Sequence, residues 1–231
     1  LHLLSRRQRQ MCIRDRYIYG VDGADIYTHL YIGNQTDIPV NNDVVQIRID
    51  SMFPWNGNIK VKVQGVKEKI KLHFRIPSYS ENFQLYCNGE EQELKVNNGY
   101  AYVEICENSR IDIQFDMPVA FLHANYKVSA DVGKVAIKRG PIVYCLEEID
   151  NGPDLQCIYL SSKEAHVRKS RSFPECFEIE LQGRRLISKS EGLYSSDGLS
   201  YSDVNIQAIP YAYWNNRREG EMLVWIHEII G

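Results

Sequence analysis

The chain has 231 residues, of which 44% are hydrophobic and 25% are charged, and its formal net charge is −3. These values are typical of a soluble globular protein that is long enough for one large domain or two ordinary ones. The mildly acidic balance gives no support for a nucleic-acid partner, and the absence of any run of eighteen apolar residues predicts no membrane span.

Residues 1–16 differ from the rest of the chain in their charge. They contain five Arg and one Asp, a net charge of +4 that leaves −7 for the other residues. A basic arm can bind RNA or act as a localisation signal. This segment, however, resembles translated sequencing-adaptor sequence of the kind found at the ends of metagenomic reading frames, and the chain starts at Leu1 rather than Met. We therefore expect residues 1–16 to be a non-native leader.

Residues 17–38 are aromatic and apolar, with a predicted turn at residues 21–23. Residues 39–118 follow a different pattern, in which apolar and polar residues alternate. In residues 70–76, Ile, Leu, Phe and Ile alternate with Lys, His and Arg, which is typical of a strand with one face on a core. Asn88-Gly89 predicts a two-residue hairpin turn of type I′. Short strands separated by turn residues favour a β-sandwich at residues 39–118.

A second β-sandwich is predicted at residues 119–218, after a boundary at Met117-Pro118. Its clearest element is residues 135–146, which read as two apolar β segments joined at Gly140-Pro141. Glycine permits an unusual φ there, and proline cannot donate a hydrogen bond to a sheet. The last strand, within residues 219–228, could return to the first sandwich. The predicted fold class is all-β.

Several longer motifs occur in order along residues 17–226. They are Phe53-Pro54-Trp55-Asn56-Gly57, Arg75-Ile76-Pro77-Ser78, Asn88-Gly89, His123-Ala124-Asn125, the stretch 132–147, Ile209-Pro210-Tyr211-Ala212-Tyr213-Trp214 and the stretch 220–226. Together these motifs resemble the C-terminal part of the β-L-arabinofuranosidase-like enzymes of glycoside hydrolase family 127.

For the fold, this resemblance implies two β-sandwich modules of jelly-roll-like form, preceded at residues 17–38 by the short last piece of a helical (α/α) catalytic barrel. For the function, it implies retaining hydrolysis of terminal β-L-arabinofuranosyl residues. The implied nucleophile is a cysteine that zinc holds together with two further cysteines and a glutamate, and another glutamate is the general acid/base. The implied partners are the rest of the catalytic barrel and an arabinose-containing glycan, with a homodimer as a further option.

The paired cysteines of the family, followed by Pro and Asn, are expected just before Tyr17, where this chain has Arg14-Asp15-Arg16. Cys12 has no neighbouring cysteine and no Pro-Asn after it. No catalytic, cofactor-binding or metal-binding residue is therefore assigned in this chain. Zinc is expected only in a catalytic domain outside it, and the sequence leaves the cellular compartment open.

Other polar residues have simpler interpretations. The acidic clusters Glu147-Glu148-Asp150 and Glu90-Glu91-Glu93 could supply the carboxylate pair of a retaining glycosidase, but acids beside turns are more often a solvated face. His73 is predicted to be exposed, whereas His29 and His123 are interpreted as structural rather than as part of a sugar pocket. The cysteines after the leader are predicted to be reduced structural thiols, namely Cys87, Cys106, Cys145, Cys157 and Cys176.

Two functional hypotheses follow. The first is a non-catalytic C-terminal β region of a glycoside hydrolase that releases β-L-arabinofuranosyl residues from plant-type glycans. It predicts that Trp55, Trp214 and Trp225 pack in cores or domain interfaces, and that residues 17–32 expose an apolar patch where barrel helices would lie. The alternative is a carbohydrate-binding module for arabinose-containing glycans, which predicts Trp55 or Trp214 on an open flat face.

Overall fold

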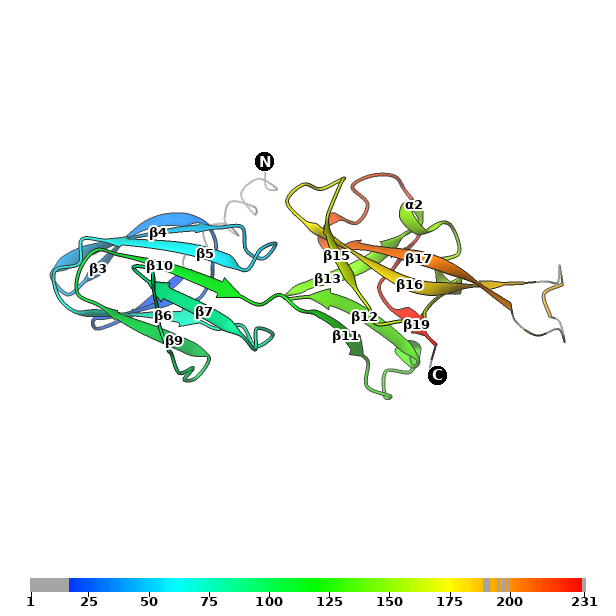
Figure 1. Cartoon of the computed structure of the whole chain (residues 1–231), viewed down its shortest axis with the longest axis horizontal. Helices are drawn as coiled ribbons and strands as arrows, with labels where there is room; N and C mark the ends of the chain where they lie inside the picture. Colours follow the sequence, from blue (N-terminus) through cyan, green and yellow to red (C-terminus); the bar gives the residue numbers. More distant parts are fainter. Residues whose placement is uncertain (1–16, 189–191, 195, 197, 199, 230–231) are drawn as a thin grey trace, which may run out of the picture. The chain divides into compact units, whose positions relative to one another are not determined.

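The computed structural model describes residues 17–188, 192–194, 196, 198 and 200–229 (Figure 1). The predicted leader at residues 1–16 lies outside this part of the chain. Contacts between residues divide the chain after Met117 into two units. The described residues are almost entirely strands and loops, which confirms the all-β prediction. No helix among them is long and apolar enough to cross a membrane.

The described part of the first unit contains two sheets. One has the strand order β1-β2-β6-β9, and the other has the order β3-β4-β5-β10-β7-β8. The strands are β1 (Tyr19–Asp22), β2 (Asp25–Thr28), β3 (Asn34–Val40), β4 (Asp43–Ser51), β5 (Asn58–Gln64), β6 (Ile70–Arg75), β7 (Phe83–Cys87), β8 (Glu90–Glu91), β9 (Tyr100–Ile105) and β10 (Ser109–Phe115).

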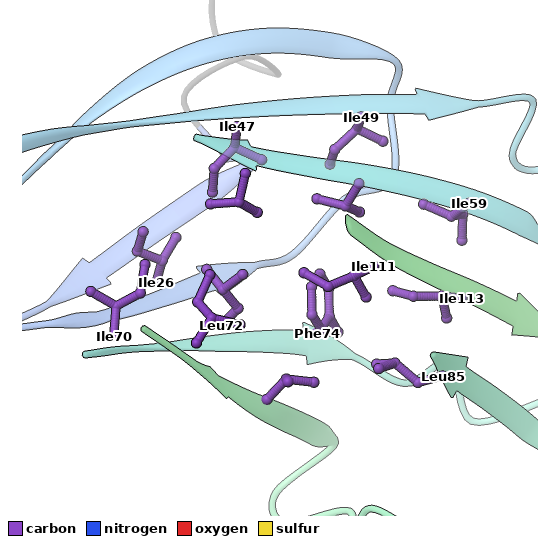
Figure 2. Packing of buried hydrophobic residues seen from close by; sticks show 14 of the residues in the cluster. Ile26, Ile47, Ile49, Ile59, Ile70, Leu72, Phe74, Leu85, Ile111 and Ile113 are labelled. Carbon is purple, nitrogen blue, oxygen red and sulfur yellow. The ribbon is translucent and has the colours of Figure 1, made fainter. Parts of the chain in front are cut away.

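The inner faces of the two sheets meet in one apolar core (Figure 2). Ile26 and Leu72 come from the first sheet, and Ile47, Ile59 and Ile111 come from the second; each is at most 1% exposed. The side chains between them point outward, as in β5, where buried and exposed residues alternate strictly. Burial of one such side chain stabilises the folded state by about 1.5–3 kcal/mol. The first unit is therefore a β-sandwich.

Residues 17–38 are strands of this sandwich, so the expectation that they end a helical barrel is wrong. Strand β2 pairs with β6 in parallel, with Ile26 opposite Leu72. Tyr31 is 3% exposed, and its hydroxyl donates to the Arg75 carbonyl over 2.6 Å. The alternation of outward and buried side chains in β2 has the period of a strand rather than of a helix. The predicted apolar patch is therefore largely core, although Tyr17 is 65% exposed.

Two positions in this unit require glycine, one in a hairpin turn and one where the backbones of two segments lie against each other. Asn88 and Gly89 have φ values of 52° and 88° and join β7 to β8, which confirms the predicted hairpin. Gly57 lies against the end of β10, where its amide carbonyl accepts from the Phe115 N–H over 3.0 Å. A Cβ atom at residue 57 would lie 2.1 Å from the Phe115 carbonyl oxygen, so a larger residue does not fit without a backbone shift.

The described part of the second unit is built on one nine-stranded sheet. Its order is β11-β12-β19-β14-β16-β17-β13-β18, and β15 pairs with β16 outside this order. Strand β12 also pairs with β13, so two strands that are distant in the order are hydrogen-bonded to each other. The strands are β11 (Val119–His123), β12 (Lys134–Arg139), β13 (Ile142–Glu147), β14 (Ile158–Leu160), β15 (His166–Lys169), β16 (Phe177–Ile187), β17 (Ser200–Pro210), β18 (Met222–Leu223) and β19 (Ile226–Glu228). The short helices are η1 (Ser129–Asp131), α2 (Glu148–Asn151), η2 (Leu155–Cys157) and η3 (Tyr211–Tyr213).

The predicted hairpin in residues 135–146 is confirmed. Strands β12 and β13 pair with Arg139 opposite Ile142, and Gly140 between them has a φ of 54°. Strand β13 then buries Tyr144 and Leu146 in the core, at 1% and 0% exposure. This strand ends at Glu147, which positions the charged cluster of the second unit.

The last strands belong to the second unit, so the option that residues 219–228 return to the first sandwich is wrong. Strand β18 pairs with β13, with Leu223 opposite Leu146. Strand β19 pairs with β12 and also lies parallel to β14, with His227 opposite Tyr159. Because β19 has a neighbour on each side, its main-chain groups are satisfied within this sheet.

Candidate functional site

The loop at residues 211–220, between β17 and β18, carries three aromatic side chains and two arginines. Pro210 ends β17, and η3 then turns the chain, with the Trp214 N–H donating to the Tyr211 carbonyl over 3.0 Å. Side chains three residues apart eclipse one another in a 3-10 helix. Tyr211 and Trp214 therefore share one face of the turn, and Tyr213 lies on another.

The pair formed by Tyr211 and Trp214 is stacked and exposed. The ring centroids are 5.9 Å apart, with 27° between the ring planes. Tyr211 is 45% exposed and Trp214 is 42% exposed. Trp214 therefore does not pack in the core of this unit, and its packing at a domain interface stays a prediction; Trp55 and Trp225 are both half-buried.

The inner side of the same loop packs on the unit. The Tyr213 ring stacks on Phe173 with centroids 4.3 Å apart and planes at 24°. The Arg217 guanidinium lies 5.8 Å from the centre of the Phe173 ring, within the range of a cation–π contact. The loop thus has an inner aromatic contact that fixes it and an outer aromatic pair that faces solvent.

Arg217 also binds two carboxylates, an arrangement we call the Arg217 latch. Its Nε donates to Glu147 over 3.1 Å and its Nη1 donates to Asp150 over 2.8 Å, while Nη2 contacts both. The Asn215 N–H donates to the other Glu147 oxygen over 2.8 Å. The hydrogen bonds to Asp150, and then those to Glu147, raise the pKa of Arg217 and keep it charged. The latch fixes the loop to the end of β13 and to α2.

The latch corrects the expectation that Glu147-Glu148-Asp150 is a solvated face. Glu147 is 4% exposed, and the Asp150 side chain is 11% exposed. Glu148 accepts a hydrogen bond from the Glu221 N–H over 3.0 Å. The carboxylates of Glu147 and Asp150 form ion pairs with Arg217, and those of Glu147 and Glu148 accept hydrogen bonds from backbone N–H groups. The other acidic cluster, Glu90-Glu91-Glu93, is exposed as predicted.

A second buried carboxylate belongs to Glu178 on β16, which is 1% exposed. It pairs with Arg168 Nη2 over 3.0 Å and accepts hydrogen bonds from Gln207, over 3.1 Å, and from Ser170. A nearby polar cavity of about 330 Å³ is lined by Asp150, His166, Glu180, Leu181, Gln182, Asn205, Ile206 and Gln207. Because its charge is compensated, Glu178 is suited to structure rather than to proton transfer.

The outer face of the four-stranded sheet in the first unit carries a row of rings. The Tyr27 ring stacks on His73 with centroids 4.1 Å apart, and His73 Nε2 contacts Asp25 Oδ2 over 3.0 Å. The His73 side chain points outward as predicted but is only 13% exposed, because these neighbours cover it. His29 hydrogen-bonds the Tyr100 hydroxyl over 2.7 Å. Burial, and then the charge of Arg75, lowers the pKa of His29.

The same unit has an open groove of about 620 Å³ near the ends of β3, β4 and β5. Arg48 and Asp50 form an ion pair of 3.1 Å within it, with both side chains about half exposed. Such surface pairs contribute little to stability. None of the described residues that line the groove is aromatic, so the groove offers no ring on which a sugar could stack.

His29 and His123 each have a hydrogen-bond partner, as expected of structural histidines, whereas the prediction that His73 is exposed is wrong. His123 Nε2 hydrogen-bonds Glu228 Oε2 over 2.7 Å, and His29 Nδ1 hydrogen-bonds the Tyr100 hydroxyl. The five cysteines after the leader are free, and burial raises the pKa of Cys145 to about 12, so its thiol is protonated at neutral pH. No group of three His, Cys, Asp or Glu side chains in the described part of the chain could hold a metal ion. These residues do not fit the zinc site that the family resemblance implies.

Comparisons with known proteins match both units. The model of the "Beta-L-arabinofuranosidase, GH127 middle domain" matches residues 25–119, and that of the "Glycoside hydrolase family 127 C-terminal domain" matches residues 119–227. The non-reducing end β-L-arabinofuranosidase of Bifidobacterium longum subsp. longum is 28% identical, over 91% of this chain and 34% of its own.

Solved structures give the same result. A GH127 β-L-arabinofuranosidase from Geobacillus stearothermophilus T6 matches with a TM-score of 0.82 and 33% identity, over 93% of this chain and 35% of its own. A GH127 β-arabinofuranosidase matches with a TM-score of 0.81 and 28% identity, over 92% of this chain and 36% of its own. The chain thus spans about a third of the length of these relatives. Because two successive domain models of one family cover both units, the chain belongs to glycoside hydrolase family 127 and comprises its middle and C-terminal domains.

Proposed function

We propose that this chain is the non-catalytic β region of a glycoside hydrolase that releases β-L-arabinofuranosyl residues from plant-type glycans. The observation that carries the proposal is the succession of the middle and C-terminal domain models over residues 25–227. The similar proteins from Bifidobacterium longum and Geobacillus stearothermophilus are β-L-arabinofuranosidases, and they suggest the substrate class. In the whole enzyme, the partner of this region is the helical catalytic barrel.

The chemistry of the described side chains supports a non-catalytic role. The buried carboxylates of Glu147, Asp150 and Glu178 are paired with Arg217 or Arg168. Most retaining glycosidases use two carboxyl groups about 5 Å apart beside the substrate, and the retaining mechanism that the family resemblance implies uses a zinc-bound cysteine with a glutamate as acid/base; in both, a carboxyl group must accept and release a proton. Carboxylates fixed by arginine are poorly suited to that exchange, and the Cys145 thiol is buried and protonated.

Hydrolysis assays test this proposal. The full chain is incubated with p-nitrophenyl arabinofuranosides of both anomers, with zinc and reductant, beside the Bifidobacterium longum enzyme as a positive control. We expect no turnover above the blank from the chain alone. We also expect the genomic sequence upstream of the Tyr17 codon to encode a helical barrel with paired cysteines. Turnover by the chain, or an upstream region of another type, would contradict the proposal.

A second candidate function is binding without cleavage. The exposed Tyr211–Trp214 pair favours it, because an aromatic face in water is what a sugar-binding surface requires. The two functions are compatible, since a non-catalytic region can hold the glycan on which a neighbouring domain acts.

A further inference from the structure

The stacked pair of Tyr211 and Trp214 offers an aromatic surface to solvent in the described chain. Full burial of a large apolar side chain stabilises a protein by about 1.5–3 kcal/mol. Tyr213, between the two exposed rings, gains such contacts by stacking on Phe173. Tyr211 and Trp214 leave nearly half of their surface in water.

The pair is held in a fixed geometry. The 3-10 turn aligns the two rings, and the Trp214 N–H donates to the Tyr211 carbonyl over 3.0 Å. The next residue, Asn215, is bound to the buried Glu147, and the Arg217 latch follows two residues later. A surface that is ordered before a ligand arrives loses less conformational entropy on binding. The latch therefore preorganises the aromatic pair.

The exposed area of the pair suits a small ligand. An aromatic side chain buries about 150–250 Å² when it is fully covered, so the exposed portions of these two rings together offer roughly 200 Å². This area is of the order needed to cover one or two sugar rings.

The surrounding chemistry suits a neutral sugar. The face of an aromatic ring carries partial negative charge. The C–H bonds of a sugar ring are weakly positive, because each carbon is attached to oxygen, so a sugar face stacks favourably on such a ring. Asn215 and Asn216 are exposed beside the pair, and their amides can both donate to and accept from hydroxyl groups.

We propose that Tyr211 and Trp214 form a stacking platform that binds an arabinofuranose ring of a plant-type glycan. The proposal rests on the proposed function for the identity of the sugar, and on the geometry of the loop for the site. The platform binds glycan without cleaving it and would concentrate substrate near the catalytic domain.

Binding of branched arabinan to the full 231-residue chain tests the platform, by calorimetry and by tryptophan fluorescence, with dextran as the control polymer. We expect Trp214→Ala and Tyr211→Ala to weaken arabinan binding at least tenfold. Tyr126→Ala is the matched control, because Tyr126 is 77% exposed in the same unit but lies outside the loop. Its binding should equal that of the unaltered chain, and thermal melts should show that all three variants remain folded.

Each other outcome has a defined meaning. Equal binding by Trp214→Ala and the unaltered chain, or equal affinity for dextran, would overturn the proposal. So would sedimentation data in which Trp214→Ala abolishes self-association while arabinan binding is unchanged, since the pair would then contact a second copy. A chain that does not bind arabinan, beside a parent enzyme that hydrolyses β-L-arabinofuranosides, would overturn the platform and leave the proposed function intact.

Discussion

The guanidinium of Arg217 binds the carboxylate of Glu147, which lies 70 residues earlier in the chain and is only 4% exposed. This pair connects the loop at residues 211–220 to the end of β13. Neither charge could be buried alone, because moving an unpaired charge out of water costs several kcal/mol. The loop that carries the exposed aromatic pair is therefore tied to the core of its unit by electrostatics.

The first prediction concerns this latch. Arg217→Met should lower the free energy of unfolding of the second unit by about 3–5 kcal/mol, because Glu147 and Asp150 would remain as buried carboxylates without a cation. Arg218→Met is the matched control, since Arg218 is exposed and should change stability by less than about 0.5 kcal/mol. Urea denaturation followed by circular dichroism measures both. An unchanged midpoint for Arg217→Met would mean that the latch contributes no net stability.

The second prediction concerns the close contact between Gly57 and the backbone of Phe115. Gly57→Ala should destabilise the first unit by about 1–3 kcal/mol, because the new methyl group would overlap the Phe115 carbonyl oxygen, 2.1 Å from the Cβ position. Gly33→Ala is the control, because the nearest atoms there lie at an ordinary contact distance of 3.6 Å. Thermal melting distinguishes them. Equal melting temperatures for the two variants would show that the end of β10 moves away at little cost.

Sequence patterns predicted the strands and hairpins that depend on local chemistry. The alternation in residues 70–76 is recovered as β6, and Asn88-Gly89 forms a hairpin turn because both residues accept positive φ. At residues 17–38, the family resemblance outweighed a weaker local signal. Strand β2 has only four residues, too few for its period of two to stand out against an expected helix.

The features of the candidate site were harder to predict for a different reason. The partner of Glu147 is 70 residues away, and no local pattern links the two positions. The exposure of Trp214 follows from a single 3-10 turn after Pro210. Two aromatic residues spaced three apart directly after a proline could have indicated such a turn. Tryptophan side chains are usually largely buried, however, and this general preference led to the prediction of a buried Trp214.

The third prediction tests whether residues 17–32 belong to the first unit. Ile26→Ala should lower its stability by about 2–5 kcal/mol, because Ile26 is completely buried. Val21→Ala is the control, since Val21 lies on the neighbouring strand β1 and is 48% exposed. A chain that starts at Gly33 should be less stable than the full chain, because it lacks β1 and β2 but keeps β3. If the shorter chain were equally stable, these strands would be dispensable to the sandwich.

The last prediction concerns pH and the contact that holds β19. Glu228 lies 2.7 Å from Lys163 Nζ and 2.7 Å from His123 Nε2. The hydrogen bond from Lys163, and then that from His123, lowers the pKa of Glu228. A carboxyl group whose pKa is lower in the folded chain than in the unfolded chain stabilises the fold fully above the unfolded value. That contribution is lost as the pH falls through the folded value.

The melting temperature of the second unit should therefore fall as the pH drops from about 5 to about 3, and Glu228→Gln should make this fall shallower. At neutral pH the same variant should melt at a lower temperature, because the glutamine amide carries no charge for Lys163. Glu219→Gln is the control, since Glu219 is exposed and lies outside β19. If Glu228→Gln and the unaltered chain lost stability in parallel on acidification, the acid response would come from other carboxylates, and the contacts of Glu228 would not contribute to it.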